Sequence, residues 1–206
     1  MFAIAAMSRN RVIGAGGNIP WQIPDELKWF RHKTFNSVVI MGRRTFEALP
    51  RPLEGRVNVV LTRHPARLRA DEKRFAHALV GRAAHRFRDV AQLTFPQTPR
   101  TRVWLVRDLG PLARAGITEH AWLCGGAQLY RQFLAECSEL YLSVVDREVG
   151  GDTLFPPFEH LFDLVGAVAE FAEFRVLRYV RRDTASRHEE PRLRPDRTEG
   201  SPPENG

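Results

Sequence analysis

The chain has 206 residues, 43% of them hydrophobic, and carries 31 Lys and Arg against 24 Asp and Glu. This length suits one domain with a sizeable core, and its 13 Phe and 4 Trp exclude a wholly disordered chain. No apolar run approaches the roughly 20 residues that a membrane-spanning helix needs. The apolar N-terminal stretch has no basic region before it, so we expect a first strand there, not an export signal.

The positive charge is concentrated in one segment. Ten basic and three acidic residues fall between Arg63 and Arg102, and this surplus of seven equals the net charge of +7 of the whole chain. The remainder is therefore balanced, which argues against a general nucleic-acid-binding surface. We interpret residues 66–102 as a basic insertion at the surface, and the alternatives are a site for an acidic partner, for nucleic acid or for another subunit.

The chain contains two cysteines, Cys124 and Cys137. Their spacing fits neither a CxxC redox pair nor a cluster of metal ligands, and two thiols are too few for a disulfide scaffold. We therefore expect unpaired thiols in a reducing cytoplasm, and no metal site.

The first part of the chain alternates between strand and helix patterns. Short apolar, β-branched runs predict strands at Phe2–Met7, Val38–Met41 and Val57–Leu61. Helices are predicted at Asp25–Thr34, directly after Pro24, and at Arg43–Leu49, directly after Gly42, with a turn-rich loop over Ser8–Pro24. This order of elements predicts an α/β fold with a largely parallel sheet.

The pattern resumes after the insertion. Strands are predicted at Val103–Val106, Ala121–Cys124 and Leu140–Val145, helices at Pro111–Ala115 and Ala127–Ala135, and a closing antiparallel pair at Phe162–Phe171 and Phe174–Val180. Residues 183–206 are rich in Pro, Glu and Arg, so we expect a disordered charged tail. The prediction is a single domain over residues 1–182, with a central, mostly parallel twisted sheet, an antiparallel C-terminal strand pair and flanking helices.

Two acids, Asp25 and Glu26, open the first predicted helix. A carboxylate buried there beside Phe30 and Trp21 would have a raised pKa, and it could hold a polar heterocycle through paired hydrogen bonds and assist a proton transfer. Glu26 shares a helix face with Phe30, which favours it over Asp25. Acids also occur in first turns merely because they stabilise the helix dipole, so the residues alone leave a structural role open.

Five motifs follow one another along the chain: Ile13-Gly14 with Ile19-Pro-Trp21, VIMGRRT at Val39–Thr45, RPLEGRVN at Arg51–Asn58, CGGAQLY at Cys124–Tyr130 and VGGDTLFP at Val149–Pro156. In this order they resemble the dihydrofolate reductase family over about residues 1–64 and 103–180. The resemblance implies an oxidoreductase that reduces 7,8-dihydrofolate to tetrahydrofolate with NADPH and so supplies one-carbon metabolism. We expect a cytoplasmic monomer without a membrane or nucleic-acid partner.

On the substrate side, the resemblance assigns Glu26 to the 2-amino and N3 edge of the pterin, with Trp21 and Ser143 as catalytic neighbours. The same resemblance implies a pocket for the pterin and benzoyl rings, lined by Ile4, Ala5, Leu27, Phe30, Leu49 and Leu53. Arg56 matches the arginine that grips the α-carboxylate of the substrate, and Arg51 is a second candidate for this tail. A planar guanidinium can bind a carboxylate through two hydrogen bonds, which an ammonium cannot.

On the cofactor side, Gly42, Arg43, Arg44 and Thr45 place two cations and a hydroxyl at a helix start, a pattern typical of an anion site. The resemblance implies that Arg43, Thr62 and Arg63 surround the 2′-phosphate, so we expect NADPH in preference to NADH. It also implies a cis peptide bond between Gly125 and Gly126, close to the pyrophosphate. The other residues expected to line the cofactor site are Ala6, Ile13, Gly14, Leu61, Cys124, Ala127, Gln128, Leu129 and Tyr130.

Two other functions are compatible with parts of the sequence. A related pterin or pyrimidine reductase on the same fold, such as the reductase of riboflavin synthesis, would have no use for Arg56, because its substrate lacks a glutamate tail. A nucleic-acid-associated protein that uses the basic insertion would bind with a steep salt dependence and lose binding when Ala66–Arg102 is deleted. Aromatic residues in that segment are sparse, which argues against this second function.

Overall fold

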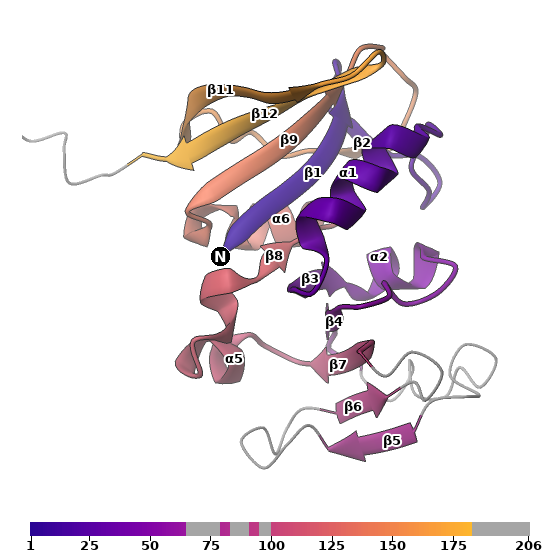
Figure 1. Ribbon diagram of the computed structural model, residues 1–206, viewed down its shortest axis with the longest axis vertical. Helices are drawn as coiled ribbons and strands as arrows, with labels where there is room; N and C mark the ends of the chain where they lie inside the picture. Colours follow the sequence, from indigo (N-terminus) through magenta and orange to yellow (C-terminus); the bar gives the residue numbers. More distant parts are fainter. Residues whose placement is uncertain (65–78, 83–90, 95–99, 183–206) are drawn as a thin grey trace, which may run out of the picture.

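The computed structural model describes residues 1–64, 79–82, 91–94 and 100–182. Ten of the described strands form one sheet in the order β11-β12-β9-β1-β8-β3-β4-β7-β6-β5 (Figure 1). The run from β9 to β7 is parallel throughout. It consists of β9 (Glu139–Val145), β1 (Phe2–Ser8), β8 (Trp122–Leu123), β3 (Val38–Gly42), β4 (Val57–Leu61) and β7 (Arg102–Val106). The predicted α/β fold with a mostly parallel sheet is confirmed.

Both edges of this sheet are antiparallel. At one edge, β11 (Phe162–Glu170) pairs with β12 (Phe174–Arg181), which in turn pairs with β9, as predicted for the C-terminal strands. At the other edge, β6 (Ala91–Thr94) pairs with β7 and with β5 (Leu79–Arg82). The basic segment therefore lengthens the sheet by two strands that the sequence pattern did not predict. Residues 65–78, 83–90 and 95–99 of that segment and the expected tail, 183–206, lie outside the described residues.

A second, small sheet joins two segments for which no strand was predicted. Its strands are β2 (Val12–Gly14) and β10 (Thr153–Leu154), which run antiparallel with Gly14 opposite Thr153. Strands of two or three residues are too short to produce a periodic pattern of apolar residues. This β2–β10 ribbon ties the turn after β1 to the segment that precedes β11.

The helices lie at the predicted places. They are α1 (Pro24–Thr34), α2 (Arg43–Ala48), α5 (Gly110–Arg114) and α6 (Ala127–Phe133), with short 3-10 helices η1 (Ile117–His120) and η2 (Leu134–Glu136). Pro24 occupies the first turn of α1, where its missing N–H costs no hydrogen bond. The predicted helix over 127–135 ends at Phe133 and continues as η2, whereas the other helices differ from prediction only at their ends.

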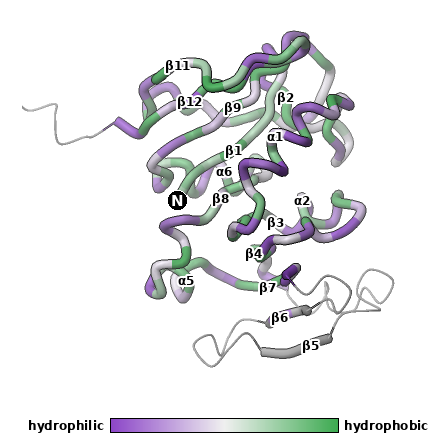
Figure 2. Tube along the Cα trace, in the orientation of Figure 1, coloured by the Kyte–Doolittle hydropathy of each residue, from purple (hydrophilic) through white to green (hydrophobic). Residues whose placement is uncertain are grey.

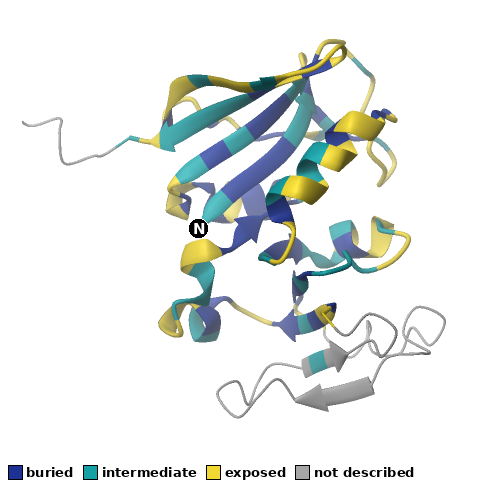
Figure 3. Ribbon diagram, viewed as in Figure 1, coloured by how far each residue is buried: buried dark blue, intermediate teal, exposed yellow. Residues whose placement is uncertain are grey.

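Side chains that alternate along the strands divide the core into two layers. In β1, Ala3 and Ala5 pack with residues of α5 and α6, whereas Ile4 packs with Phe46 of α2 on the opposite face. Hydrophobic residues follow the central strands in Figure 2, and Figure 3 shows that much of this region is buried. Such strands, covered on both faces, explain the near-continuous apolar runs in the sequence.

The carboxyl ends of the parallel strands lie at one edge of the sheet. Gly42 at the end of β3 is opposite Leu61 at the end of β4, and Leu61 is opposite Val106 at the end of β7. The segments that follow these ends therefore emerge side by side, the usual place for a ligand in an open α/β sheet.

Candidate functional site

A long cleft of about 1690 Å³ crosses this edge of the sheet. Its volume exceeds the roughly 300–1,000 Å³ of a pocket for one small molecule, so it has room for two ligands side by side. Most of the expected site residues line it: Ile4, Ala5, Ala6, Ile13, Gly14, Glu26, Leu27, Phe30, Gly42, Arg43, Arg44, Thr45, Leu49, Arg51, Leu53, Arg56, Leu61, Thr62, Arg63, Cys124, Gly126, Ala127, Gln128, Leu129 and Tyr130. Trp21, Gly125 and Ser143 are not among its lining residues.

Glu26 is the acid that faces the cleft. It lies in the first turn of α1, is 6% exposed, and accepts a hydrogen bond of 3.2 Å from the hydroxyl of Ser143 on β9. Burial raises the pKa of Glu26 above its usual value, and the Ser143 hydrogen bond partly offsets that rise. A protonated carboxyl is therefore favoured at higher pH than for an exposed glutamate.

Asp25 and Trp21 lie outside the cleft. Asp25 is exposed and forms an ion pair of 2.8 Å with Lys28, which is three residues further along the same helix. The Trp21 side chain is buried in a cluster with Ile23, Val145 and other apolar residues. The sequence analysis expected Trp21 beside the acid; its side chain is buried in this cluster and is not among the residues that line the cleft.

Arg56 lines the cleft near the end of α1, and its side chain is buried, with only 4% of the residue exposed. It donates hydrogen bonds to the backbone oxygens of Thr34 and Arg31, at 3.2 Å and 3.1 Å, and its guanidinium lies 5.6 Å from the centre of the Phe30 ring. These carbonyls belong to the last turn of α1, where a cation is stabilised by the helix dipole. Burial lowers the pKa of Arg56. It is thus no surface arginine.

Arg51 has a different environment from Arg56. It lines the cleft but its side chain is 73% exposed, and it forms an ion pair of 3.1 Å with Glu54. An exposed pair of this kind is weak and easily exchanged. Arg51 is therefore available at the rim of the cleft, whereas Arg56 is held in place within it.

The turn after β8 approaches the start of α2 closely. The peptide bond between Gly125 and Gly126 is cis, as the family resemblance implied, and Gly42 N–H donates to Gly125 O at 2.8 Å. Gly125 has φ 95°, and a Cβ on it would lie 2.7 Å from the ring of Tyr130. Only glycine fits this position, and the turn leaves backbone exposed to the cleft at Gly126.

Arg43 forms an ion pair with Glu47. One of its terminal nitrogens lies 2.7 Å from both carboxylate oxygens of Glu47, one helical turn along α2. Arg44 and Arg63 also line the cleft, and neither forms an ion pair within the described part of the chain. The expectation that Arg43 contacts a cofactor phosphate stays a prediction, because the pair with Glu47 is partly exposed and occupies only one of the two terminal nitrogens of Arg43.

Other cleft residues were missed by the sequence analysis. Arg31 follows Leu27 by four residues and Arg107 directly follows β7, so helix periodicity and the carboxyl-edge rule could have found them. Asp152 and Thr153 lie at the start of β10; both belong to the VGGDTLFP motif, which could have pointed to them. The remaining residues not predicted there are Gly17, Asn18, Gln22, Met41, Ala48, Pro50, Pro52, Glu54, His64, Arg131 and Gln132.

The described residues offer neither a cluster of metal ligands nor a membrane-spanning helix. They contain no group of three or more His, Cys, Asp or Glu side chains placed to hold a metal ion. Across the same residues, every helix is too short or too polar to cross a membrane.

Comparisons with known proteins agree with the geometry. The profile of the dihydrofolate reductase family matches residues 1–92 and 101–173, and thus extends into the segment that sequence analysis placed outside the resemblance. Dihydrofolate reductase type 3 of Salmonella typhimurium is 36% identical over 155 residues, 75% of this chain and 77% of that protein. The dihydrofolate reductase of Haemophilus influenzae is 34% identical over 153 residues, 74% of this chain and 76% of that protein.

A solved structure has a similar fold. Dihydrofolate reductase from Enterococcus faecalis, complexed with NADP(H) and RAB-propyl, superposes with a TM-score of 0.61 at 23% identity, covering 88% of this chain and 96% of that one. At this level of identity the likeness supports the fold alone.

Proposed function

The chain belongs to the dihydrofolate reductase family, and from that premise we propose that its cleft binds 7,8-dihydrofolate and NADPH side by side and reduces the former to tetrahydrofolate. The observation that carries this proposal is the pair of buried ionisable side chains, Glu26 and Arg56, in one cleft. Each side chain suits one end of a long substrate: Glu26 can bind a polar heterocycle, and Arg56 can bind a carboxylate.

The substrate end of the cleft has the chemistry that dihydrofolate needs. The carboxyl of Glu26 can pair with the adjacent ring nitrogen and amino group of the pterin. Leu27, Phe30, Leu49 and Leu53 line the wall between Glu26 and Arg56, where the aromatic part of the substrate would pack. The N–H groups of Arg56 that are not used by Thr34 and Arg31 can donate to the terminal carboxylate.

The cofactor end fits an anionic dinucleotide. Arg44, Arg63 and Thr62 lie where β3 and β4 end, and the backbone at Gly126 is open to the cleft. Because α2 and α6 have only six and seven residues, the attraction for phosphate comes chiefly from these side-chain cations. Two arginine forks near one hydroxyl favour a cofactor with an additional phosphate, NADPH in preference to NADH.

The chain contributes positioning and proton control. When bound, NADPH supplies a hydride to C6 of the pterin. Glu26, held by Ser143, fixes the orientation of the pterin and stabilises its protonation; since it faces the opposite edge of the ring, the proton at N5 arrives through water. The apolar walls exclude bulk water and hold the two rings at reacting distance. The loop over residues 15–24, which includes exposed Ile19, would open and close this end.

A direct assay tests the proposed function. Oxidation of reduced nicotinamide, followed by absorbance, should require dihydrofolate, and kcat/KM should be about 10- to 100-fold higher with NADPH than with NADH, as expected for charged hydrogen bonds to one phosphate. Absence of dihydrofolate-dependent oxidation would reject the proposal. Equal kcat/KM for the two cofactors would reject the role of Arg44 and Arg63.

The molecule is further proposed to act as a monomer, because both halves of the cleft come from one chain, and to work in the cytoplasm. Light scattering coupled to gel filtration should give a mass close to 23.5 kDa. A mass of twice that value at micromolar concentration would contradict this proposal.

A further inference from the structure

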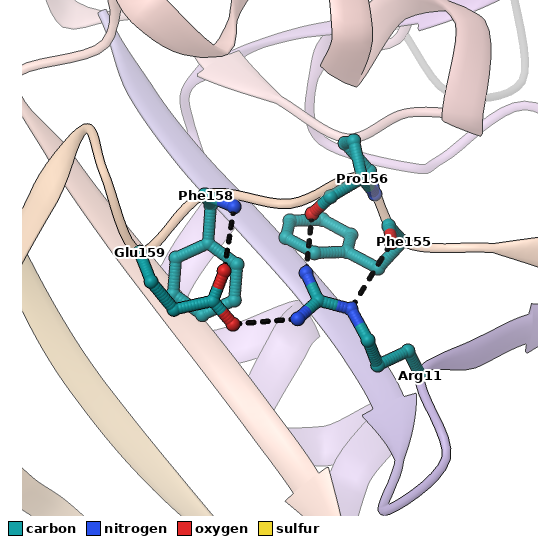
Figure 4. A network of polar contacts seen from close by, with 5 residues as sticks. All are labelled: Arg11, Phe155, Pro156, Phe158 and Glu159. Atoms are coloured by element: carbon teal, nitrogen blue, oxygen red, sulfur yellow. Dashed lines mark hydrogen bonds and ion pairs between the residues drawn. The ribbon is translucent and has the colours of Figure 1, made fainter.

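Arg11 binds a segment that is distant in the sequence through all three nitrogens of its guanidinium (Figure 4). Its Nε donates to the backbone oxygen of Phe155 at 3.4 Å, one terminal nitrogen donates to the oxygen of Pro156 at 2.6 Å, and the other donates to Glu159 at 2.5 Å. The guanidinium also lies 5.4 Å from the centre of the Phe158 ring. Arg11 thus contacts four of the five residues from Phe155 to Glu159.

The backbone of Arg11 takes part in the same arrangement. Its carbonyl oxygen accepts a hydrogen bond of 2.8 Å from Phe155 N–H, and the residue adopts φ 65°, a left-handed conformation that is uncommon for a side chain of this size. The left-handed turn between β1 and β2 is therefore held by contacts on both its backbone and its side chain. Residues with unfavourable backbone geometry persist where the surrounding structure fixes them.

The Arg11 contacts lie at one end of the β2–β10 ribbon, and the other end of that ribbon lines the cleft. Gly14 and Thr153 pair across it, and Asp152 N–H donates to Gly14 O at 3.1 Å. Asp152 also accepts a hydrogen bond of 2.9 Å from Gly16 N–H, at the start of the loop over residues 15–24. The position of this wall of the cleft therefore depends on where Arg11 holds the ribbon.

A second path leads from the same contacts to the cofactor end of the cleft. Phe155, held by Arg11, packs its ring 4.8 Å from that of Tyr130, and the Tyr130 hydroxyl donates to Ile4 O at 2.7 Å. The Tyr130 ring lies against the Gly125–Gly126 turn and leaves no room for a Cβ on Gly125. Buried aromatic contacts of this kind transmit a displacement because close-packed interiors deform little.

We propose that Arg11 is a positioning residue for hydride transfer: its guanidinium fixes the β2–β10 ribbon and Phe155, and thereby sets the distance between the nicotinamide side of the cleft and the pterin side. This inference rests on the proposed function, but Arg11 itself does not line the cleft and touches neither ligand. A lysine cannot replace it, because one compact ammonium cannot reach two carbonyl oxygens and a carboxylate together.

The test compares Arg11→Gln and Arg11→Lys with a matched control, Arg9→Gln. Arg9 lies in the same turn and forms an exposed ion pair of 3.1 Å with Asp146, away from the ribbon. In single-turnover mixing of the NADPH complex with dihydrofolate, Arg11→Gln should lower the rate constant of hydride transfer by about 10- to 100-fold, and Arg11→Lys by at least about fivefold. Arg9→Gln should stay within about twofold of the original chain.

The rate constant distinguishes positioning from a loss of stability. A smaller folded fraction reduces the amplitude of a single turnover but leaves its rate constant unchanged. With NADPH deuterated at the transferred position, the isotope effect on steady-state turnover should rise in the Arg11 variants, as hydride transfer becomes rate-limiting. An unchanged rate constant in a folded Arg11→Gln variant would overturn the proposal. If that variant does not fold, Arg11→Lys decides the matter by the same criterion.

Amide hydrogen exchange gives a measurement that needs no ligand. In Arg11→Gln, exchange at Asp152 and Phe155 should be faster by about tenfold than in Arg9→Gln, since both amides belong to the ribbon that Arg11 holds. Equal exchange in the two variants would overturn the proposal. A wild-type chain without dihydrofolate reduction would reject the proposed function alone, and the exchange result would still decide the role of Arg11 in holding the ribbon.

Discussion

Replacing Glu26 with Gln is expected to lower the rate of dihydrofolate reduction at neutral pH by at least about 100-fold, the range found for a positioned acid or base. Gln keeps the size of the side chain and can still accept from Ser143, but it cannot carry the charge or the proton of the carboxyl. The measurement is the single-turnover rate of hydride transfer as a function of pH. NADPH affinity should change little, because Glu26 lies at the substrate end of the cleft.

Asp25→Asn is the matched control for this variant. Asp25 is the preceding residue, but it is exposed and paired with Lys28, so its loss should change turnover by no more than about twofold. The wild-type rate should fall as pH rises through the raised pKa of Glu26, whereas the rate of Glu26→Gln should lack that dependence. If Asp25→Asn were the slower variant, the assignment of the acid to Glu26 would be wrong.

The stability of Glu26→Gln shows whether lost activity reflects lost structure. Because burial raises the pKa of Glu26 in the folded state, ionised Glu26 costs folding free energy above that raised pKa, and the cost disappears below its unfolded value of 4.5. Glu26→Gln should therefore unfold at a higher temperature than wild type at neutral pH, by about 2–4 °C, and the difference should vanish as pH falls below 4.5. Less stable Gln protein at pH 7 would contradict this account.

Arg56→Lys is expected to raise the KM for dihydrofolate by about 10- to 100-fold while leaving kcat within a few-fold. Lysine retains the positive charge, so the loss measures the planar fork that can bind the substrate carboxylate with two parallel hydrogen bonds. The steady-state KM is the quantity to compare, with Arg51→Lys as a control. Arg51 is exposed and paired with Glu54, and its substitution should change the KM much less.

A shortened substrate separates the two roles of Arg56. Besides facing the cleft, Arg56 holds the last turn of α1 through Thr34 O and Arg31 O. With a dihydropterin that lacks the glutamate tail, wild type and Arg56→Lys should have equal KM values if the arginine acts on the tail. A rise of the same size with both substrates would mean that Arg56 acts only by supporting α1.

The order of the elements and the general location of the site could be predicted from the sequence. Strand runs such as Val57–Leu61 and the Pro24 that opens α1 are local signals, and they depend on neighbours within a few residues. The strands β5 and β6 were missed because the segment around them alternates poorly and is rich in arginine. Their pairing is determined by the edge of β7, which no local pattern reports.

Side-chain environments needed the tertiary structure. Trp21 and Glu26 lie close together in the sequence and both are buried, yet only Glu26 is among the residues that line the cleft. Arg43 was expected at the anion site from its place at the start of α2, and only the structure shows that Glu47 pairs with one of its terminal nitrogens. The left-handed Arg11 and the ribbon beyond it depend on Phe155, about 140 residues away in the chain.

Composition and local patterns were enough to predict the α/β architecture, a balanced charge outside one basic segment, and a helix start that carries two carboxylates within an ordered set of motifs. The sequence favoured Glu26 over Asp25, and the folded chain shows the environments that distinguish them: Glu26 is buried against Ser143, a residue 117 positions away, whereas Asp25 is exposed. The physical reason is that periodicity and composition report local backbone preference, whereas desolvation and hydrogen-bond partners depend on which distant residues meet.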